Sequence, residues 1–435
     1  MPPCLSTTTI EVKLHMLTEQ KRWFYVALPV FFFWFFGQID KLSISIIQTD
    51  PQFLQDLGLT GPNKNALVGL LTLIFTIAYS VSNIFWGVII DKLGARKTAI
   101  IGLSVWTVTM VAGGMAQSYE MFMLSRIILG LGEGMMIPVS AKFISNWFNS
   151  REIGRAQASW IIGNYLGPAI GALILTYLIT TYSWHVSFYV LASFTLFISL
   201  PLFMFLARNT PEEHPGVSQK ELAHIRLAET TARTSEEKKS FLTNYRYWIV
   251  FFGNLMSSFI FFGISIWLPT YLVEAKHFSR EAMAGITSLS WMFALCFVIL
   301  GGFLADKKKR PGLLASIWFI LCVLFLTSAY FATNPLIAGV SLGIAMGTQG
   351  GMFHLVNLFV VKYSTKETAG KAAGIMGFTN ILGGFSSYIM GWMRDMSGGD
   401  FTPTIMLLIV TAALGFIAYA TTLKKESEEI RSFHA

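Results

Sequence analysis

Long apolar segments recur along the whole chain of 435 residues, and they restrict its fold more than any other feature. A helix needs roughly 20 mostly apolar residues to cross the hydrocarbon core of a bilayer. Twelve segments meet this requirement, at approximately 23–47, 66–90, 98–116, 120–145, 156–180, 186–207, 247–272, 283–305, 312–331, 335–361, 371–393 and 402–423. The chain is therefore predicted to be an all-α polytopic membrane protein with twelve transmembrane helices.

The composition agrees with a membrane protein. Hydrophobic residues make up 54% of the chain and charged residues only 13%. A soluble protein of this length would expose more charge, because charged groups are rarely buried unless they are paired. Three scattered cysteines, Cys4, Cys296 and Cys322, form neither a disulfide framework nor a metal site, so we expect no metal and no cofactor.

The positive charge of the chain predicts its orientation. A net charge of +8 could indicate a nucleic-acid partner, but cytoplasmic loops of membrane proteins also collect Lys and Arg. With both termini inside, 25 of the 32 Lys and Arg residues lie in cytoplasmic segments and 4 lie in outside loops. We therefore expect no nucleic acid as a partner, and a multi-pass protein of the cell membrane with both termini cytoplasmic. The short loops are typical of a bacterial inner membrane.

A polar stretch from Arg208 to Tyr245 separates six spans from six. It predicts an N-terminal six-helix bundle at 1–207, a cytoplasmic central loop at 208–245 and a C-terminal six-helix bundle at 246–435. The middle of the loop, 218–233, could form a short surface helix. Similar loops follow the second and eighth spans, at 87–97 and 302–310. A recurring six-helix unit suggests two pseudo-symmetric bundles with a site between them.

The first of these loops has the spacing Gly87-x-x-x-Asp91-Lys92-x-Gly94-x-Arg96-Lys97. We expect Gly87 to allow close helix contact and Asp91 to face the N-terminus of another helix, which favours an anion. A plain cytoplasmic loop would explain the basic residues, but it would not explain the spaced Gly and Asp residues.

Four charged residues fall deep inside predicted spans. Asp40 and Lys41 lie in the first span, and Arg126 and Glu133 lie in the fourth. Such charges are expensive in a membrane and usually face a cavity, so each is a candidate functional residue. Arg126 and Glu133 are nearly two helical turns apart, which places them on one face with about 10 Å between them. The alternative is that Asp40–Lys41 and Arg126–Glu133 only neutralise one another.

The two loops, together with Arg126-x-x-x-Gly130, resemble signatures of the major facilitator superfamily, and the resemblance covers nearly the full chain. It implies the major facilitator fold and transport by alternating access of a central site. It also implies that a latch for one conformation lies in the first loop. The latch residues would be Gly87, Asp91, Gly94 and Arg96.

The four buried charges resemble those of the anion:cation symporter branch of this superfamily, which includes bacterial carriers for sugar acids. The resemblance implies that Lys41 and Tyr79 bind substrate and that Asp40, Arg126 and Glu133 couple proton transfer. Asn380 is similar in place to a substrate-contacting Asn of that branch. The branch usually has Arg where this chain has Lys41, which holds an anion as a point charge and not bidentately.

Other polar residues of the second half allow two interpretations. Gln349, His354 and Asn357 in the tenth span, with Asn254 in the seventh, could line the site or form helix–helix hydrogen bonds. Of these we place Gln349 with the substrate-binding candidates. Trp267 and Tyr271, near an outer helix end, are interpreted as membrane-interface anchors.

The leading hypothesis is a monomeric secondary transporter that carries a small organic anion together with protons, in contact with membrane lipid. The alternative is a proton-coupled efflux antiporter for an amphipathic or cationic compound. The sequence Gly163-x-x-x-Gly167-Pro168-x-x-Gly171 resembles a motif of drug antiporters, although close helix packing also explains it. Lys41 and Arg126 favour an anion. An enzyme is not expected, since there is no metal cluster, nucleophile elbow or phosphate-binding loop.

Overall fold

The computed structural model describes residues 20–149, 152–226, 241–308, 310–364 and 368–434. In these ranges the chain forms helices and no strand. The first half contains η1 (Trp23–Ala27), α2 (Leu28–Ile47), α3 (Pro51–Asp56), α4 (Lys64–Gly114), α5 (Tyr119–Glu133), α6 (Met136–Trp147), α7 (Ile153–Thr181), α8 (Trp184–Phe194), η2 (Thr195–Ser199), η3 (Leu202–Leu206), η4 (Pro211–Glu213) and α9 (Gln219–Arg226). The second half contains η5 (Phe241–Thr243), α10 (Tyr245–Thr270), η6 (Tyr271–Ala275), α11 (Arg280–Lys308), α12 (Pro311–Phe331), α13 (Pro335–Gly350), α14 (Met352–Tyr363), α15 (Ala369–Met396) and α16 (Thr402–His434).

Every predicted span falls on helical structure, and the all-α polytopic fold is confirmed. Ten helices of the described residues are long and apolar enough to cross a membrane. One of them, α4, contains two of the predicted spans, 66–90 and 98–116. The predicted span 371–393 lies in α15, which is not among the ten and in which Gly, Ser, Thr and Asn replace many larger apolar side chains.

The helix α4 is two spans joined by a sharp turn. A straight helix of its 51 residues would be about 75 Å long, more than twice the thickness of a bilayer core. Gly94 interrupts it with φ 77° and ψ 161°, a backbone conformation that only glycine adopts readily. A Cβ on Gly94 would also lie 2.7 Å from Oδ1 of Asn209. The turn therefore needs glycine for two independent reasons.

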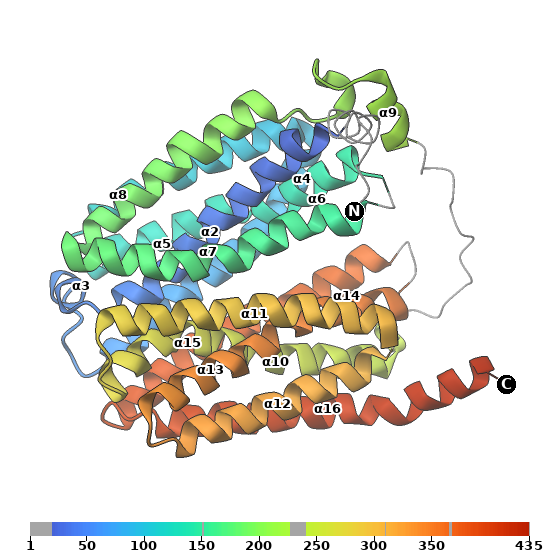
Figure 1. Ribbon diagram of the computed structural model, residues 1–435. Coiled ribbons are helices and arrows are strands. Elements are labelled where there is room, and N and C mark those ends of the chain that lie inside the picture. The colour runs from blue at the N-terminus through green and yellow to red at the C-terminus, as the bar shows by residue number, and fades with distance from the viewer. Residues whose placement is uncertain (1–19, 150–151, 227–240, 309, 365–367, 435) are drawn as a thin grey trace, which may run out of the picture.

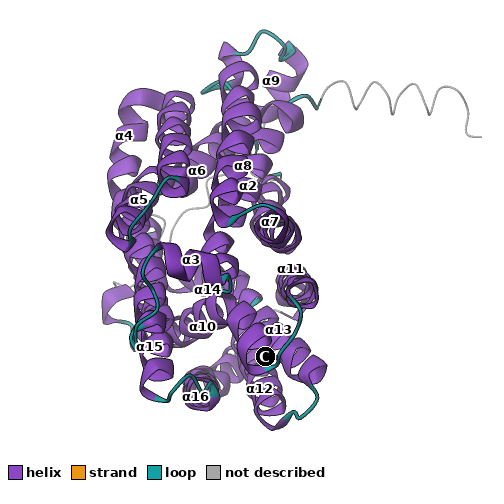
Figure 2. Ribbon diagram, turned by 90° about the vertical axis from the view of Figure 1, so that its left-hand side faces the viewer, coloured by secondary structure: helices purple, strands orange, loops and turns teal. Residues whose placement is uncertain are grey.

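The helices form two groups that lie side by side (Figure 1). Helices α2 and α4 to α8 make up one group, and helices α10 to α16 make up the other, as the view from the side also shows (Figure 2). Contacts between the groups join α4 to α15, α7 to α11 and α2 to α10. The division agrees with the predicted halves, while the proposed boundaries at 207 and 245 stay a prediction.

Polar contacts between the halves gather at one end of the molecule, which we call the Asn65 end. Asp50 pairs with Arg280 at 3.1 Å, and the side-chain amide of Gln48 donates to the carbonyl of Ile266 at 2.6 Å. The backbones also touch here, because a Cβ on Gly69 would lie 2.3 Å from the carbonyl oxygen of Ser387. The halves are therefore closed on each other at the Asn65 end. The opposite end, which holds the Gly94 turn, is called the Asp91 end.

The fourth and tenth predicted spans are both locally irregular near their middle, although the backbone there stays in the right-handed helical region. The fourth is divided between α5 and α6 directly after Glu133, and the tenth between α13 and α14 at Gly350 and Gly351. The repeated irregularity extends the sequence similarity of the two halves to their backbone. It also places Glu133 and Gln349 at matching positions, each next to a helix irregularity.

Helix α9 attaches the segment after the sixth span to the first half. The Arg22 guanidinium is buried and pairs with Glu152 at 2.8 Å and with Glu221 of α9 at 3.0 Å. Burial raises the pKa of Glu152, but the hydrogen bonds and charge of Arg22 and then those of His224 outweigh it, so that the pKa lies below its ordinary value. The helix expected within 218–233 thus covers Gln219–Arg226, and residues 227–233 lie outside the described residues.

The structure corrects one interpretation of aromatic residues. Trp267 and Tyr271 were expected to anchor the membrane interface, but they are only 3% and 4% exposed. The indole of Trp267 donates to the carbonyl of Ser387 on α15, so it belongs to the contact between two helices of the second half. Aromatic residues at helix ends pack inward where two helices cross closely, and sequence position alone does not separate this case from a lipid-facing anchor.

The glycines of the fifth span serve helix packing. Cβ atoms on Gly163 and Gly167 would lie 2.6 and 2.3 Å from carbonyl oxygens of Phe31 and Phe35 on α2. Helix α7 therefore lies against α2 at a distance that side chains would prevent. This contact supplies the packing explanation of the motif and gives no support to the efflux alternative.

Candidate functional site

Two ion pairs connect α2 with α5 in the interior of the first half. Arg126 Nη1 lies 3.7 Å from Asp40 Oδ1, and Lys41 Nζ lies 2.8 Å from Glu133 Oε2. The structure thus brings together all four charges that the sequence singled out. They pair between helices, and not within each helix as the alternative interpretation supposed.

The members of the two pairs differ in exposure. Asp40, Arg126 and Glu133 are 1%, 2% and 0% exposed, whereas the Lys41 side chain is 20% exposed. Burying a charge is unfavourable unless an opposite charge and hydrogen bonds compensate it, which explains why each is paired. Lys41 is the member of this cluster that a dissolved ion can reach first.

Aromatic rings surround the Lys41 ammonium. Its Nζ lies 4.8 Å from the ring centre of Tyr79, 5.9 Å from that of Trp34 and 6.0 Å from that of Phe75. These distances are within the range of cation–π attraction. Tyr79 of α4, which the resemblance names as a substrate-binding candidate, thus lies beside Lys41.

The Asp40–Arg126 pair has neighbours that the sequence did not reveal. The indole nitrogen of Trp106 donates to Asp40 Oδ2 at 3.0 Å, and Arg126 lies between the rings of Phe122 and Phe188, about 5 Å from each centre. Within the described part of the chain, the Nε atom of Arg126 has no hydrogen-bond partner. The only sequence signal for Trp106 is its place near the middle of a span, since tryptophan in membrane proteins favours the interfaces.

Glycines allow α5 to lie directly on α4. A Cβ on Gly130 would be 2.7 Å from the carbonyl of Phe75, and one on Gly134 would be 1.9 Å from the hydroxyl of Ser82. The Arg126-x-x-x-Gly130 motif therefore combines a buried charge with a close helix contact one turn later. This contact holds Glu133 and Tyr79 at the same level of the bundle, on either side of Lys41.

The candidates of the second half form their own hydrogen bonds. Gln349 is 3% exposed and donates to Thr348 at 3.1 Å, while its Oε1 atom has no partner among the described residues. Asn380 is exposed and accepts a hydrogen bond from Ser258 at 3.2 Å, and Asn254 donates to Thr379 at 2.6 Å. The side chain of His354 lies outside the described residues.

The latch residues are at the Asp91 end. Asp91 is 71% exposed and pairs with Lys142 at 3.3 Å, so it does not face a helix N-terminus in this conformation. Arg96 donates through its side chain to the carbonyl of Met204 and through its backbone to Asn209. A Cβ on Gly87 would meet nothing within 4 Å, and the expected close contact is absent here. In the matching loop of the second half, the side chain of Asp306 lies outside the described residues.

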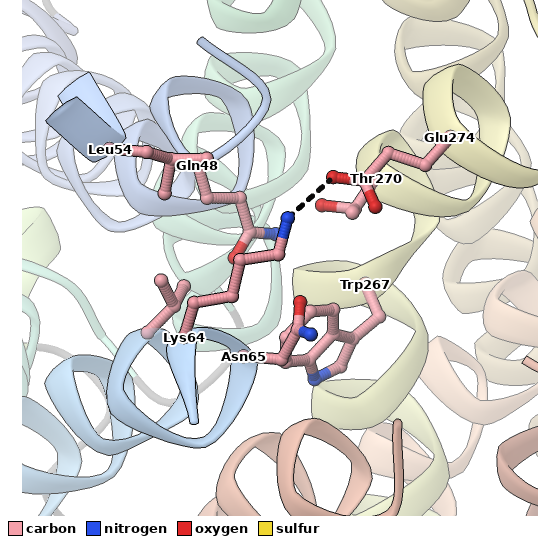
Figure 3. Close-up of a pocket in the computed structure, with 8 residues that line it drawn as sticks. Gln48, Leu54, Lys64, Asn65, Trp267, Thr270 and Glu274 are labelled. Carbon is pink, nitrogen blue, oxygen red and sulfur yellow. Dashed lines mark ion pairs between the residues drawn. The ribbon is translucent and has the colours of Figure 1, made fainter. Parts of the chain in front are cut away.

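The best-defined small cavity lies at the Asn65 end, away from the four charges (Figure 3). Its lining includes Lys64, Glu274 and Trp267, and its volume of about 10 Å³ is close to the space for one water molecule. It is therefore too small for an organic substrate. Among the described residues, no group of three His, Cys, Asp or Glu side chains could hold a metal ion.

Comparison with known proteins decides the family. The family model for the Major Facilitator Superfamily matches residues 30–388, which include both ion pairs and the Gly94 turn. The chain belongs to this superfamily. It is accordingly a multi-pass membrane transporter and not an enzyme, and the family predicted from the sequence is confirmed.

The relatives of this transporter are similar over nearly their full length. The hexuronate transporter of Bacillus subtilis is 27% identical over 412 residues, which cover 90% of this chain and 94% of that protein. The probable sulfoacetate transporter of Cupriavidus necator is 27% identical over 406 residues, covering 89% and 90%. A crystal structure of a bacterial homologue of the human lysosomal transporter Spinster has a TM-score of 0.73 at 16% identity, covering 94% and 98% of the two chains, and thus shares the fold.

Proposed function

We propose that this transporter carries a small organic anion together with protons, in the same direction, by alternating access. The observation that supports this most directly is the charge balance of the site. Asp40 and Glu133 are matched by Arg126 and Lys41, so the four charges sum to zero when all are ionised. A bound monoanion then adds one uncompensated negative charge to a buried cluster, and one proton on a carboxylate restores the balance.

Glu133 is the carboxylate best placed to take this proton. In the resting site it neutralises the Lys41 ammonium at 2.8 Å, and an arriving substrate carboxylate must compete with it. Protonation of Glu133 weakens that ion pair and leaves the ammonium, which is 20% exposed, to the substrate. Binding of anion and proton thereby favour each other, which is the requirement for symport. Asp40 and Arg126 neutralise each other and form the other ion pair of the cluster.

The remaining candidates fit a site between the halves. Tyr79 lies against Lys41, and we propose that Gln349 and Asn380 complete the site from the second half when the bundles approach. The unpartnered Oε1 of Gln349 can accept a hydrogen bond from a substrate hydroxyl. The names of the relatives, which include hexuronate and sulfoacetate transporters, support small organic acids as the substrate class.

The charge balance argues against efflux of cations. A carrier for cationic compounds would need a carboxylate free to meet the substrate, whereas both buried carboxylates here are paired with basic side chains. An approaching cation would be repelled by Lys41, the most exposed charge of the site.

We further propose that the Asp91 end is cytoplasmic, as are both termini. Asp91, Gly94, Arg96 and Gly87 would then latch the cytoplasmic side in the opposite conformation, in which Asp91 leaves Lys142 for a helix N-terminus. Asp91→Asn should slow transport while substrate binding persists, because a neutral amide interacts less favourably with a helix dipole than a carboxylate does. Unchanged transport rates in proteoliposomes would reduce the loop to a determinant of topology.

The substrate class can be tested by thermal unfolding of the purified transporter with sugar acids, sulfonates, dicarboxylates and cationic drugs. A ligand that binds the native state raises the unfolding temperature. We expect an organic acid to do so in the wild type, to lose the effect in Lys41→Ala and to keep part of it in Lys41→Arg. Stabilisation by cationic compounds alone, or by an acid equally in Lys41→Ala, would contradict the proposal.

A further inference from the structure

The structure assigns a positioning role to Trp106, which orients Asp40 against Arg126 within the four-charge cluster. Trp106 is 1% exposed, and its indole nitrogen donates to Asp40 Oδ2 at 3.0 Å. The absence of a side chain at Gly37 makes room for the ring, since a Cβ there would lie 3.1 Å from Trp106 Cη2. The second half of α4 thus delivers a fixed donor to a buried carboxylate of α2.

This donor makes the two oxygens of Asp40 different. An indole N–H can only donate, so Oδ2 is held as an acceptor. Oδ1 faces Arg126 at 3.7 Å and has no hydrogen-bond partner among the described residues. The indole therefore fixes the carboxylate with Oδ1 towards Arg126.

The role rests on the proposed proton-coupled transport, and the pH profile of uptake can test it. The ionisable groups around Asp40 are Lys41, Arg126, Glu133 and Tyr79, and all of them persist in Trp106→Phe. Removal of the donor lets Asp40 turn away from Arg126 and disturbs the charge balance of the cluster, so the pH profile of uptake in proteoliposomes should be displaced by about one unit. Trp147→Phe is the matched control, because the buried indole of Trp147 donates to the carbonyl of Arg208, outside this cluster.

The outcomes for Trp106→Phe and for the wild type test the positioning role and the proposed function separately. A profile for Trp106→Phe that coincides with wild type and with Trp147→Phe overturns the positioning role. Uptake by the wild type that ignores the proton gradient contradicts the proposed function itself. If Trp106→Phe does not reconstitute, Trp106→Gln retains a neutral N–H donor and should keep the wild-type profile, whereas a profile displaced in this variant as well counts against the role.

A second and independent observation concerns the Asn65 end, where a carboxylate of one half caps a helix of the other. The N-cap residue of α4, Asn63, makes no side-chain hydrogen bond to its own helix. Asp395 of α15 takes its place: Oδ1 accepts from the backbone and side-chain nitrogens of Asn65, at 3.2 and 2.7 Å, and Oδ2 accepts from the backbone of Ala66 at 2.8 Å.

The neighbouring residue strengthens this contact. Arg394 is 3% exposed; its Nη1 donates to Asn65 Oδ1 at 2.7 Å, and its Nη2 pairs with Glu274. Glu274 in turn lies 3.9 Å from Lys64 (Figure 3), the first residue of α4. Asn65 thus binds both Arg394 and Asp395, and residues of the second half hold the N-terminus of α4.

We infer that the Asp395 cap is a conformational lock, specific for the state in which the Asn65 end is closed. First-turn N–H groups of a helix attract a carboxylate through hydrogen bonds and the helix dipole. Here the carboxylate belongs to the opposite half, so the attraction exists only while the halves touch. Its whole free energy therefore favours the closed state, which an ordinary cap within one half would not do.

Distance measurements between spin labels test the lock. Labels at Gln55 and Leu336 would lie on opposite halves near the Asn65 end, at exposed positions outside the contact, in a background without the native cysteines. Asp395→Asn should enlarge the long-distance population about fivefold. Asp400→Asn is the matched control, because Asp400 caps α16 within its own half, accepting from Thr402 at 2.9 Å. Equal distance distributions for the two variants would overturn the inference.

Discussion

Two adjacent residues of α2, Asp40 and Lys41, form separate ion pairs with Arg126 and Glu133 of α5, and the two pairs differ in their surroundings. Asp40 and Lys41 are adjacent in sequence, but their side chains leave α2 in different directions and meet different residues of α5. One pair is fully buried and sealed by aromatic rings, whereas the other has a partly exposed ammonium. Lys41, in the partly exposed pair, can exchange Glu133 for a substrate anion. The buried Asp40–Arg126 pair is suited to keep both of its charges compensated.

The sealed pair predicts a stability effect. Arg126→Met leaves Asp40 as a buried charge without a paired opposite charge, which should destabilise the protein by about 3–5 kcal/mol at neutral pH. Asp40 can relieve the loss by taking up a proton, so the difference from wild type should shrink as the pH falls. Thermal unfolding between pH 8 and pH 5 measures it.

The double variant Asp40→Asn with Arg126→Met provides the control, because it removes both charges at once. It should recover much of the stability that Arg126→Met loses, and its difference from wild type should not depend on pH in this range. Additive effects of the two substitutions would show that Asp40 and Arg126 do not interact.

At this scale the sequence predicted which residues matter but not how they pair. Charges inside apolar segments can be identified without a structure, because charged residues are rare in membrane spans, where they are energetically costly. Their pairing depends on the rotation of α2 against α5, which no local pattern encodes. Trp106 was missed for the same reason, since its hydrogen bond joins residues 66 positions apart.

Among the helices, α4 depends most on a single residue. Gly94 turns the chain at positive φ, next to Asn209. Gly94→Ala should destabilise the protein by about 1–3 kcal/mol, since an alanine is strained in this conformation. The matched variant Gly87→Ala, seven residues earlier in open space, should be neutral or slightly stabilising. Equal unfolding temperatures for the two variants would contradict this reading of the turn.

Helix existence was predictable from apolar length, whereas local helix irregularities were not. The irregularities after Glu133 and at Gly350 lie inside runs that remain apolar throughout, so hydropathy passes over them. The inward packing of Trp267 escaped prediction because burial in protein and burial in lipid select the same side chains. Both features come from contacts with neighbouring helices.

At the scale of the whole molecule, the Asn65 end and the Asp91 end differ in the contacts that their carboxylates make between the two halves. Asp395 caps a helix of the opposite half, while exposed Asp91 pairs with Lys142 of its own half. In the opposite conformation we expect the Asn65 end to be open and Asp91 to contact the other half. The repeated six-helix pattern predicted two halves, but which end is closed depends on tertiary contacts that the repeat does not specify.

Cysteine labelling checks the proposed orientation. In intact cells, an impermeant thiol reagent should label Gly61→Cys, in an exposed loop at the Asn65 end, and spare Ser235→Cys, which lies outside the described residues. The native cysteines are first replaced, and a permeant reagent should label both variants. Labelling of Ser235→Cys from outside would reverse the assignment of the two membrane sides.

The central claim is that protonation of Glu133 couples the proton gradient to anion transport, and Glu133→Gln in proteoliposomes tests it most directly. The glutamine resembles a permanently protonated carboxyl group, so it should free Lys41 for the substrate but release no proton. We predict that counterflow of labelled substrate persists, while accumulation driven by an inward proton gradient is lost. Accumulation by Glu133→Gln at the wild-type level would contradict the account.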